Sequence, residues 1–179
     1  MTIPDQLTVA RALSVPVVVA LFAVDFRNHA YWATGLFVVA MATDQVDGWL
    51  ARRWNQTSAL GALLDPIADK VLVLAAMTML VGQHVVPAWM VAAIIARELI
   101  VSGLRMAALE RDVVIAARDL GKLKTWAQAV AVGVGGFAAA GAWDRGAAWW
   151  ALLVAVVLTW LSAIDYARVT PRMLRGERI

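Results

Sequence analysis

Long apolar runs alternate with short polar segments along the whole chain. Six of these runs reach about 20 residues, the length that an α-helix needs to cross a hydrocarbon core about 30 Å thick. The apolar residues are continuous, whereas the strands of a membrane barrel would show apolar and polar residues in alternation. The pattern therefore predicts an all-α polytopic membrane protein with six transmembrane helices in a single domain, residues 1–179. The expected spans are 7–24, 32–52, 58–81, 87–108, 122–142 and 147–167.

The composition agrees with a lipid bilayer as the solvent. Of the 179 residues, 62% are hydrophobic and 16% are charged, which is more apolar than a soluble domain of this length needs to be. The chain has no cysteine, so disulfides, thiolate metal sites and cysteine catalysis are excluded. The formal charge is only +3, and no basic run suggests a nucleic-acid partner.

The basic residues indicate how the helices are oriented, because cytoplasmic loops carry an excess of lysine and arginine. The non-cytoplasmic side has only Arg27 and Arg145. Lys70 and Arg97 lie deeper within spans. All the other basic residues lie at the termini, in the even-numbered connections or at the span ends beside them. These are Arg11, Arg52, Arg53, Arg105, Arg111, Arg118, Lys122, Lys124, Arg168, Arg172, Arg175 and Arg178. Both termini are therefore expected in the cytoplasm.

Four aspartates interrupt the second and third spans: Asp44, Asp47, Asp65 and Asp69. Each costs about 2.5–3.5 kcal/mol at the centre of a membrane helix. Together the four would cost about 10 kcal/mol, which is comparable to the whole stability of a domain, about 5–15 kcal/mol. A purely structural role is disfavoured at this cost, so a function must retain them.

Helical periodicity brings the four carboxylates together. Asp44 and Asp47 lie about 60° apart around their helix, and Asp65 and Asp69 lie about 40° apart around theirs. The two spans form a hairpin around the polar segment "RRWNQT", so the two acidic faces can meet. All-oxygen ligation without histidine or cysteine suits Mg²⁺ or Mn²⁺, which also bind substrate phosphates. Two such ions about 3.5–4 Å apart would assist displacement at phosphorus.

Small residues flank the acids on the same helix faces. Gly48, Ala51 and Gly61 leave space beside the carboxylates for a diphosphate or a nucleotide. The alternative interpretation is that these residues let the two helices pack closely.

The stretch from Asp44 to Asp69 resembles the signature of the CDP-alcohol phosphatidyltransferases, "D-x2-D-G-x2-A-R-x8-G-x3-D-x3-D", and matches it at every fixed position. The resemblance implies six transmembrane helices, a homodimer and a site that faces the cytoplasm. There an alcohol hydroxyl attacks the β-phosphate of a CDP-linked lipid and releases CMP. It further implies that Asp44, Asp47 and Asp65 ligate two divalent cations, with Asp47 shared, and that Asp69 is both a ligand and the catalytic base. Residues expected around the cytidine diphosphate are Gly48, Ala51, Arg52 and Gly61.

The fourth and fifth spans carry the candidates for binding the acceptor. Arg97, Glu98 and Arg105 lie within an arc of about 100° on one helix. If the next helix includes Arg118, then Arg118, Lys122 and Thr125 share a face and Lys124 points away. We therefore predict that Arg97, Arg105 and Lys122 clamp a phosphate on the acceptor alcohol. The alternatives are an ion pair for Arg97 with an acid on a neighbouring helix, and snorkelling to the interface for Lys122 and Lys124.

The acceptor segments resemble the bacterial phosphatidylglycerophosphate synthase branch of the family. The chain start "IPDQLTVARALSVP" is similar to that branch's "IPN-x-LT-x2-R-x4-P", apart from Asp5 in place of asparagine. The resemblance implies transfer of a phosphatidyl group from CDP-diacylglycerol to sn-glycerol 3-phosphate in the bacterial cytoplasmic membrane, giving phosphatidylglycerophosphate and CMP. The acceptor alternatives within the family are an inositol phosphate or phosphatidylglycerol.

Two other classes of protein would also hold charged residues in a membrane. A proton- or cation-coupled transporter would explain buried acids, but the four acids cluster on one cytoplasmic hairpin and the chain shows no inverted repeat. A non-catalytic lipid-binding scaffold would need the basic residues and would not need the metal-type acids. Release of CMP separates an enzyme from both alternatives.

Overall fold

A computed structural model shows six α-helices in the part of the chain that it describes. It describes the backbone of residues 3–54, 59–109 and 119–174, and the side chains of residues 10–43, 67–104, 106 and 120–166. The helices are α1 (Ile3–Ala23), α2 (His29–Trp54), α3 (Ala59–Gly82), α4 (Ala88–Leu109), α5 (Asp119–Ala139) and α6 (Arg145–Leu174). No strand occurs in these stretches. The all-α class and the six helices are confirmed for these stretches, with ends that differ by a few residues from those expected, whereas their crossing of a membrane stays a prediction.

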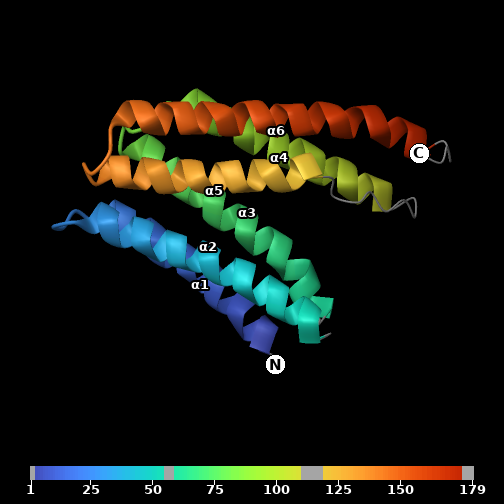
Figure 1. Ribbon diagram of the computed structural model, residues 1–179, viewed down its shortest axis with the longest axis horizontal. Coiled ribbons are helices and arrows are strands. Elements are labelled where there is room, and N and C mark those ends of the chain that lie inside the picture. The colour runs from blue at the N-terminus through green and yellow to red at the C-terminus, as the bar shows by residue number, and fades with distance from the viewer. Residues whose placement is uncertain (1–2, 55–58, 110–118, 175–179) are drawn as a thin grey trace.

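The three odd-numbered connections are tight turns, and each has a local cause. Asn28 and His84 take up left-handed backbone conformations, with φ of 65° and 54°. Gly141 has a φ of 77°, a conformation that glycine adopts without steric cost. The Asp144 carboxylate accepts a hydrogen bond from the Gly146 amide at 2.8 Å, which caps the N-terminus of α6. All three turns lie at the left end in Figure 1.

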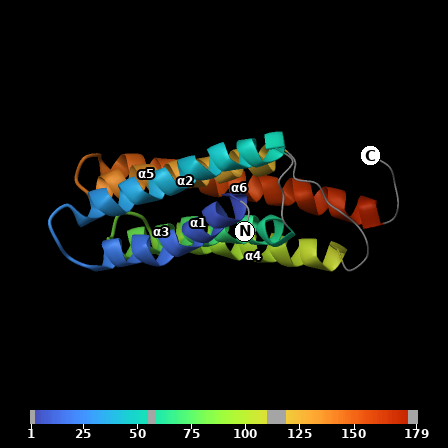
Figure 2. The same ribbon diagram turned by 90° about the horizontal axis from the view of Figure 1, so that it is seen from below.

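The helices are arranged in two groups that converge at this turn end. In Figure 1 the pair α1–α2 and the layer of α4, α5 and α6 diverge toward the other end, and α3 runs obliquely between them. Figure 2 shows α2 and α5 on one side, and α1, α3 and α4 on the other. The arrangement agrees with the contacts of α3 with α1, α4 and α5, and of α2 with α5.

The apolar core lies in the half of the bundle nearest the three turns. Its largest fully buried side chains come from five helices: Phe22, Phe37, Leu72, Met77, Leu80, Met90, Ile94 and Leu152. Helix α5 comes close to its neighbours there, because a Cβ atom at Gly136 would overlap Thr34 of α2 and one at Gly135 would overlap Leu80 of α3. These two glycines are therefore packing residues.

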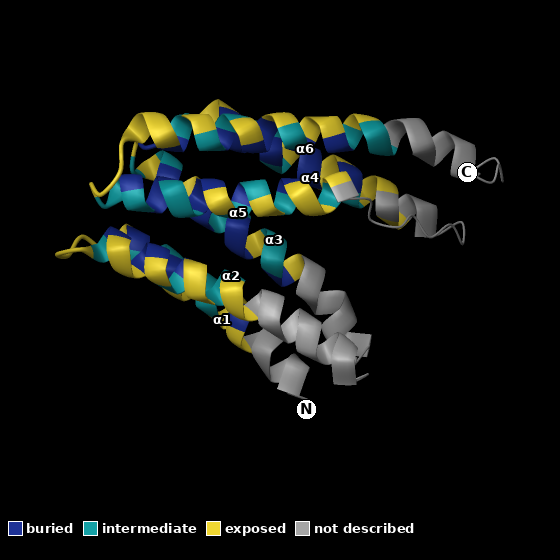
Figure 3. Ribbon diagram, in the orientation of Figure 1, coloured by how far each residue is buried: buried dark blue, intermediate teal, exposed yellow. Residues whose placement is uncertain are grey.

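Large apolar side chains also cover much of the outer surface. Exposed examples include Trp32, Leu99, Met106 and Trp150, each with more than 60% of its surface accessible. Figure 3 shows exposed positions along the outer faces of the described helices. Within the described residues, Arg145–Tyr166 of α6 is long and apolar enough to cross a membrane. Only 33% of its most apolar window is buried, so most of that surface faces outward, as in a helix that contacts lipid.

Candidate functional site

The backbone carries the four aspartates on two adjacent helices. Asp44 and Asp47 lie on α2, and Asp65 and Asp69 lie on α3. The two helices contact each other, and only four residues connect them. Both helices are continuous through these positions, so each pair shares a helix face as predicted. Among the four acids, the structure describes the side chain of Asp69 only.

For several predicted site residues, the structure describes the backbone but not the side chain. These residues include Asp44, Asp47 and Asp65, and also Arg105 of α4. They also include the residues predicted around the cytidine diphosphate, which are Gly48, Ala51, Arg52 and Gly61. Arg118 lies outside the described residues altogether. The prediction of two acidic faces that meet, and that of a space for a nucleotide, stay predictions.

Asp69 is held by an ion pair from α1. The Nη1 atom of Arg11 donates a hydrogen bond to Oδ1 of Asp69 at 2.8 Å. The arginine side chain is 5% exposed and that of the aspartate is 27% exposed, so the contact is shielded from solvent on the arginine side. Arg11 was expected only to mark the cytoplasmic side. The sequence signal that points to it is its place in the segment "R-x4-P" near the start of the chain.

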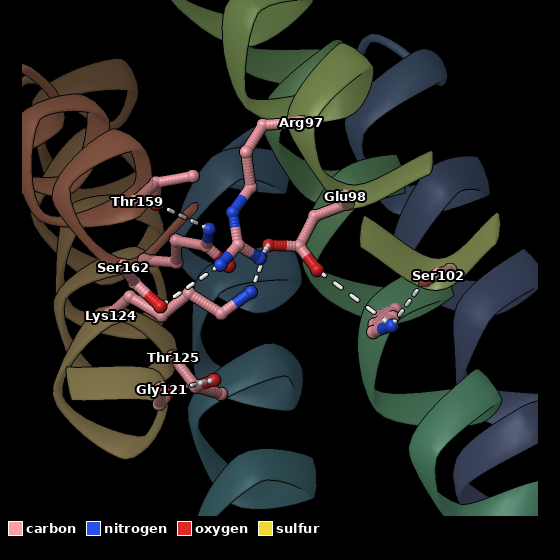
Figure 4. Close-up of polar contacts among 10 residues, drawn as sticks. Arg97, Glu98, Ser102, Gly121, Lys124, Thr125, Thr159 and Ser162 are labelled. Carbon is pink, nitrogen blue, oxygen red and sulfur yellow. Dashed lines mark hydrogen bonds and ion pairs between the residues drawn. The ribbon is translucent and has the colours of Figure 1, made fainter. Parts of the chain in front are cut away.

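A second polar cluster lies between α3, α4, α5 and α6 (Figure 4). Glu98 is its centre, since its Oε1 accepts hydrogen bonds from Nη1 of Arg97 at 2.8 Å and from Nζ of Lys124. The Nζ atom of Lys70 lies 3.8 Å from Oε2 of the same glutamate. Arg97, Glu98 and Lys124 are all buried, with 3%, 4% and 8% of their surface exposed. Lys70 therefore forms an ion pair with this glutamate.

Hydroxyl and amide groups extend this cluster, which we call the Glu98 cluster, to its neighbouring helices. Nη2 of Arg97 donates to Oγ of Ser162 on α6 at 3.0 Å, and Nζ of Lys70 donates to Oγ of Ser102 at 2.7 Å. One helical turn beyond Lys124, Nε2 of Gln128 donates to Oγ1 of Thr159 at 2.9 Å. Buried charges are tolerated only when they are paired and hydrogen-bonded. The carboxylate of Glu98 thus pairs with cations from α3, α4 and α5.

Lys122 and Lys124 lie on different faces of α5, as predicted, but Lys124 is the lysine beside Arg97, where Lys122 was expected. The ammonium group of Lys124 is buried and shares the carboxylate of Glu98 with Arg97. Lys122 lies two residues earlier, which is about 200° around the helix from Lys124. It therefore faces another direction, and it is exposed. The ion pair weighed as an alternative for Arg97 does form, and its acid is Glu98 of the same helix.

The acidic hairpin has the donor chemistry for hard divalent cations. Its four candidates are carboxylates, and oxygen ligands suit Mg²⁺ and Mn²⁺. Among the side chains that the structure describes, no group of three or more metal-type ligands gathers. Asp69, the one acid of the set that is described, faces α1. That Asp44, Asp47, Asp65 and Asp69 hold such ions stays a prediction.

Comparison with known proteins agrees with the aspartate signature. The family model of the CDP-alcohol phosphatidyltransferases matches residues 1–161. A Bacillus subtilis protein is 41% identical over 143 residues, which cover 73% of this chain and 74% of the relative. An Escherichia coli protein is 45% identical over 135 residues, with the same coverage. Both relatives are named CDP-diacylglycerol–glycerol-3-phosphate 3-phosphatidyltransferase.

The chain belongs to the CDP-alcohol phosphatidyltransferase family. It is therefore an enzyme, a transferase of phospholipid biosynthesis.

Proposed function

We propose that this enzyme transfers the phosphatidyl group of CDP-diacylglycerol to sn-glycerol 3-phosphate, forming phosphatidylglycerophosphate and CMP. The observation that carries the proposal is the unbroken aspartate signature from Asp44 to Asp69 in a chain 41–45% identical to two relatives of that name. The basic segments of α4 and α5, which a phosphate-bearing acceptor would need, support the same choice of acceptor.

The proposed setting is the bacterial cytoplasmic membrane. All six helices cross it, both termini lie in the cytoplasm, and the acidic hairpin faces the same side. The outward-facing apolar surface of α6 and the distribution of basic residues support this topology. The protein acts as a homodimer, a proposal that rests on the family resemblance.

In the reaction, the free hydroxyl of the acceptor attacks the β-phosphorus of the CDP-lipid. Asp69 takes the proton of that hydroxyl, a bond forms between its oxygen and phosphorus, and the bond from phosphorus to the CMP oxygen breaks. Asp44, Asp47, Asp65 and Asp69 hold two divalent cations, Mg²⁺ or Mn²⁺, with Asp47 shared between them. These ions, when bound, neutralise the charge that develops on the diphosphate. Gly48, Ala51, Arg52 and Gly61 surround the cytidine diphosphate.

The phosphate of the acceptor binds the cations at the adjoining ends of α4 and α5. Arg97, Arg105 and Lys122 form the proposed clamp. The Glu98 cluster supports the place of Arg97 in this clamp, because Glu98 holds the guanidinium of that arginine at 2.8 Å. A dianionic phosphate that reaches Arg97 would gain a charge-assisted hydrogen bond from a side chain that is already ordered.

The test is a CMP-release assay with purified protein in detergent, CDP-diacylglycerol and Mg²⁺. CMP should form when glycerol 3-phosphate is added, and phosphatidylglycerophosphate should appear in equal amount. Parallel reactions with an inositol phosphate and with phosphatidylglycerol separate the acceptors within the family. A protein that releases no CMP with any acceptor, yet carries protons or divalent cations across vesicles, would be a transporter.

A further inference from the structure

We infer that Arg11 is a positioning residue that fixes the direction of the Asp69 carboxylate. The inference rests on the proposed function, in which Asp69 takes the proton of the acceptor hydroxyl. It adds a member to the site from α1, a helix that contributes no residue to the aspartate signature. The contact joins residues 58 positions apart, so it exists only because α1 packs against α3.

The geometry of the pair explains how one residue can orient the other. Nη1 of Arg11 lies 2.8 Å from Oδ1 of Asp69, within the range of a charge-assisted hydrogen bond. Holding Oδ1 in place restricts rotation of the carboxylate about its bond to Cβ, and so sets the direction of Oδ2. The guanidinium is almost fully buried, so water and salt screen the interaction little. Arg11 is also tied to its own helix, because its carbonyl accepts a hydrogen bond from Ser14 Oγ at 2.7 Å.

A carboxylate that must receive a proton or bind an ion performs better when it is already oriented. Hydrogen bonds from outer groups orient ligating carboxylates, and their loss typically costs 10- to 100-fold in metal affinity or activity. The competing explanation is that the ion pair only joins α1 to α3. Under that explanation its removal would lower stability and would leave the turnover of the folded enzyme unchanged.

The same helix pair offers a matched control. At the other end of α3, Nε2 of Gln83 donates to the carbonyl of Phe22 in α1 at 3.0 Å. This hydrogen bond also joins the two helices, and it lies in the half of the bundle that contains the apolar core. Gln83→Met therefore removes a polar α1–α3 contact without touching Asp69.

The experiment compares Arg11→Gln, Arg11→Lys and Gln83→Met in detergent. We expect kcat of Arg11→Gln to fall about 10- to 100-fold, with the KM of each substrate within about threefold of the native value. Arg11→Lys should lose less, because its ammonium keeps the charge but presents no planar fork. It also keeps the test available if Arg11→Gln does not fold. Mn²⁺ affinity, measured by electron paramagnetic resonance without substrates, should weaken in Arg11→Gln and stay native in Gln83→Met.

Chemical rescue and a double-mutant cycle complete the test. Added guanidinium should restore part of the kcat of Arg11→Gly and none of that of Arg11→Gly/Asp69→Asn. Arg11→Gln should add little to the loss caused by Asp69→Asn. A kcat of Arg11→Gln within threefold of native, or unchanged or tighter Mn²⁺ binding, would overturn the inference. Full turnover by Asp69→Asn would instead contradict the proposed base, whatever the Arg11 variants do.

Discussion

Lys124 of α5 and Arg97 of α4 share one carboxylate, that of Glu98. All three side chains are buried, and Glu98 compensates both cations, so its removal would leave like charges together in a medium of low dielectric. Lys122, two residues before Lys124, is exposed on the other side of α5. Replacing one lysine or the other should therefore affect the stability of the protein differently.

Replacing Lys124 with methionine should destabilise the protein, whereas replacing Lys122 with methionine should leave its thermal stability unchanged. Glu98 keeps its ion pair with Arg97 when Lys124 is replaced, so the expected cost is that of one buried hydrogen bond to a charged group, about 1.5–3 kcal/mol. Thermal unfolding in detergent, followed by circular dichroism, measures the difference. Glu98→Gln/Lys124→Met should be more stable than the sum of its single substitutions predicts. Equal stability of the two lysine variants would contradict the buried position of Lys124.

The acceptor clamp predicts a difference between the two substrates. Arg105→Ala and Lys122→Ala should raise the KM for glycerol 3-phosphate, and should leave the KM for CDP-diacylglycerol nearly native. One charge-assisted contact to a phosphate is worth about 1.5–3 kcal/mol, or about ten- to hundredfold in kcat/KM. Steady-state kinetics with each substrate varied in turn decides the matter. Equal turnover with glycerol and with glycerol 3-phosphate would remove the case for a clamp.

Metal removal should abolish activity, and Mg²⁺ or Mn²⁺ should restore it, because four carboxylates provide the ligands. If Asp47 is shared by both ions, then Asp47→Asn should be at least as damaging as Asp44→Asn. Titration of CMP release with Mg²⁺ after treatment with a chelator compares the two variants. Turnover that persists in excess chelator would contradict the two-ion mechanism. An active Asp47→Asn variant would contradict the proposal that both ions share Asp47.

The contact of α5 with α2 predicts opposite effects for two glycine substitutions. Gly136→Ala should destabilise the protein by about 1–3 kcal/mol, because the new methyl group would overlap Thr34 in a packed core. Gly35→Ala is the control, since a Cβ atom there meets nothing within 4 Å. It should be neutral or stabilising by up to about 1 kcal/mol, because alanine favours a helix more than glycine does. Thermal unfolding of both variants checks the prediction.

The apolar runs of the sequence were sufficient to predict the helices, because the number of helices and their approximate ends follow from the number and length of the runs. They could not predict the contacts of Lys124 or of Arg11. Spacing along one helix fixes which residues share a face, but it leaves open how that helix is rotated against its neighbours. The ends of helices add to this uncertainty, since the expected direction of Lys124 depended on where α5 begins. The partner of Asp69 lay on another helix, and no spacing within α3 could have indicated it.

Arg11, Asp69 and Glu98 lie near the middle of α1, α3 and α4. Among the described side chains, the largest fully buried apolar ones lie nearer the three turns, where they contribute hydrophobic stabilisation. The Glu98 cluster adjoins that core along α4, where Ile94 is fully buried one turn before Glu98. A substitution in the cluster should therefore change the stability of the protein together with any binding of the acceptor, and the two effects have to be measured separately.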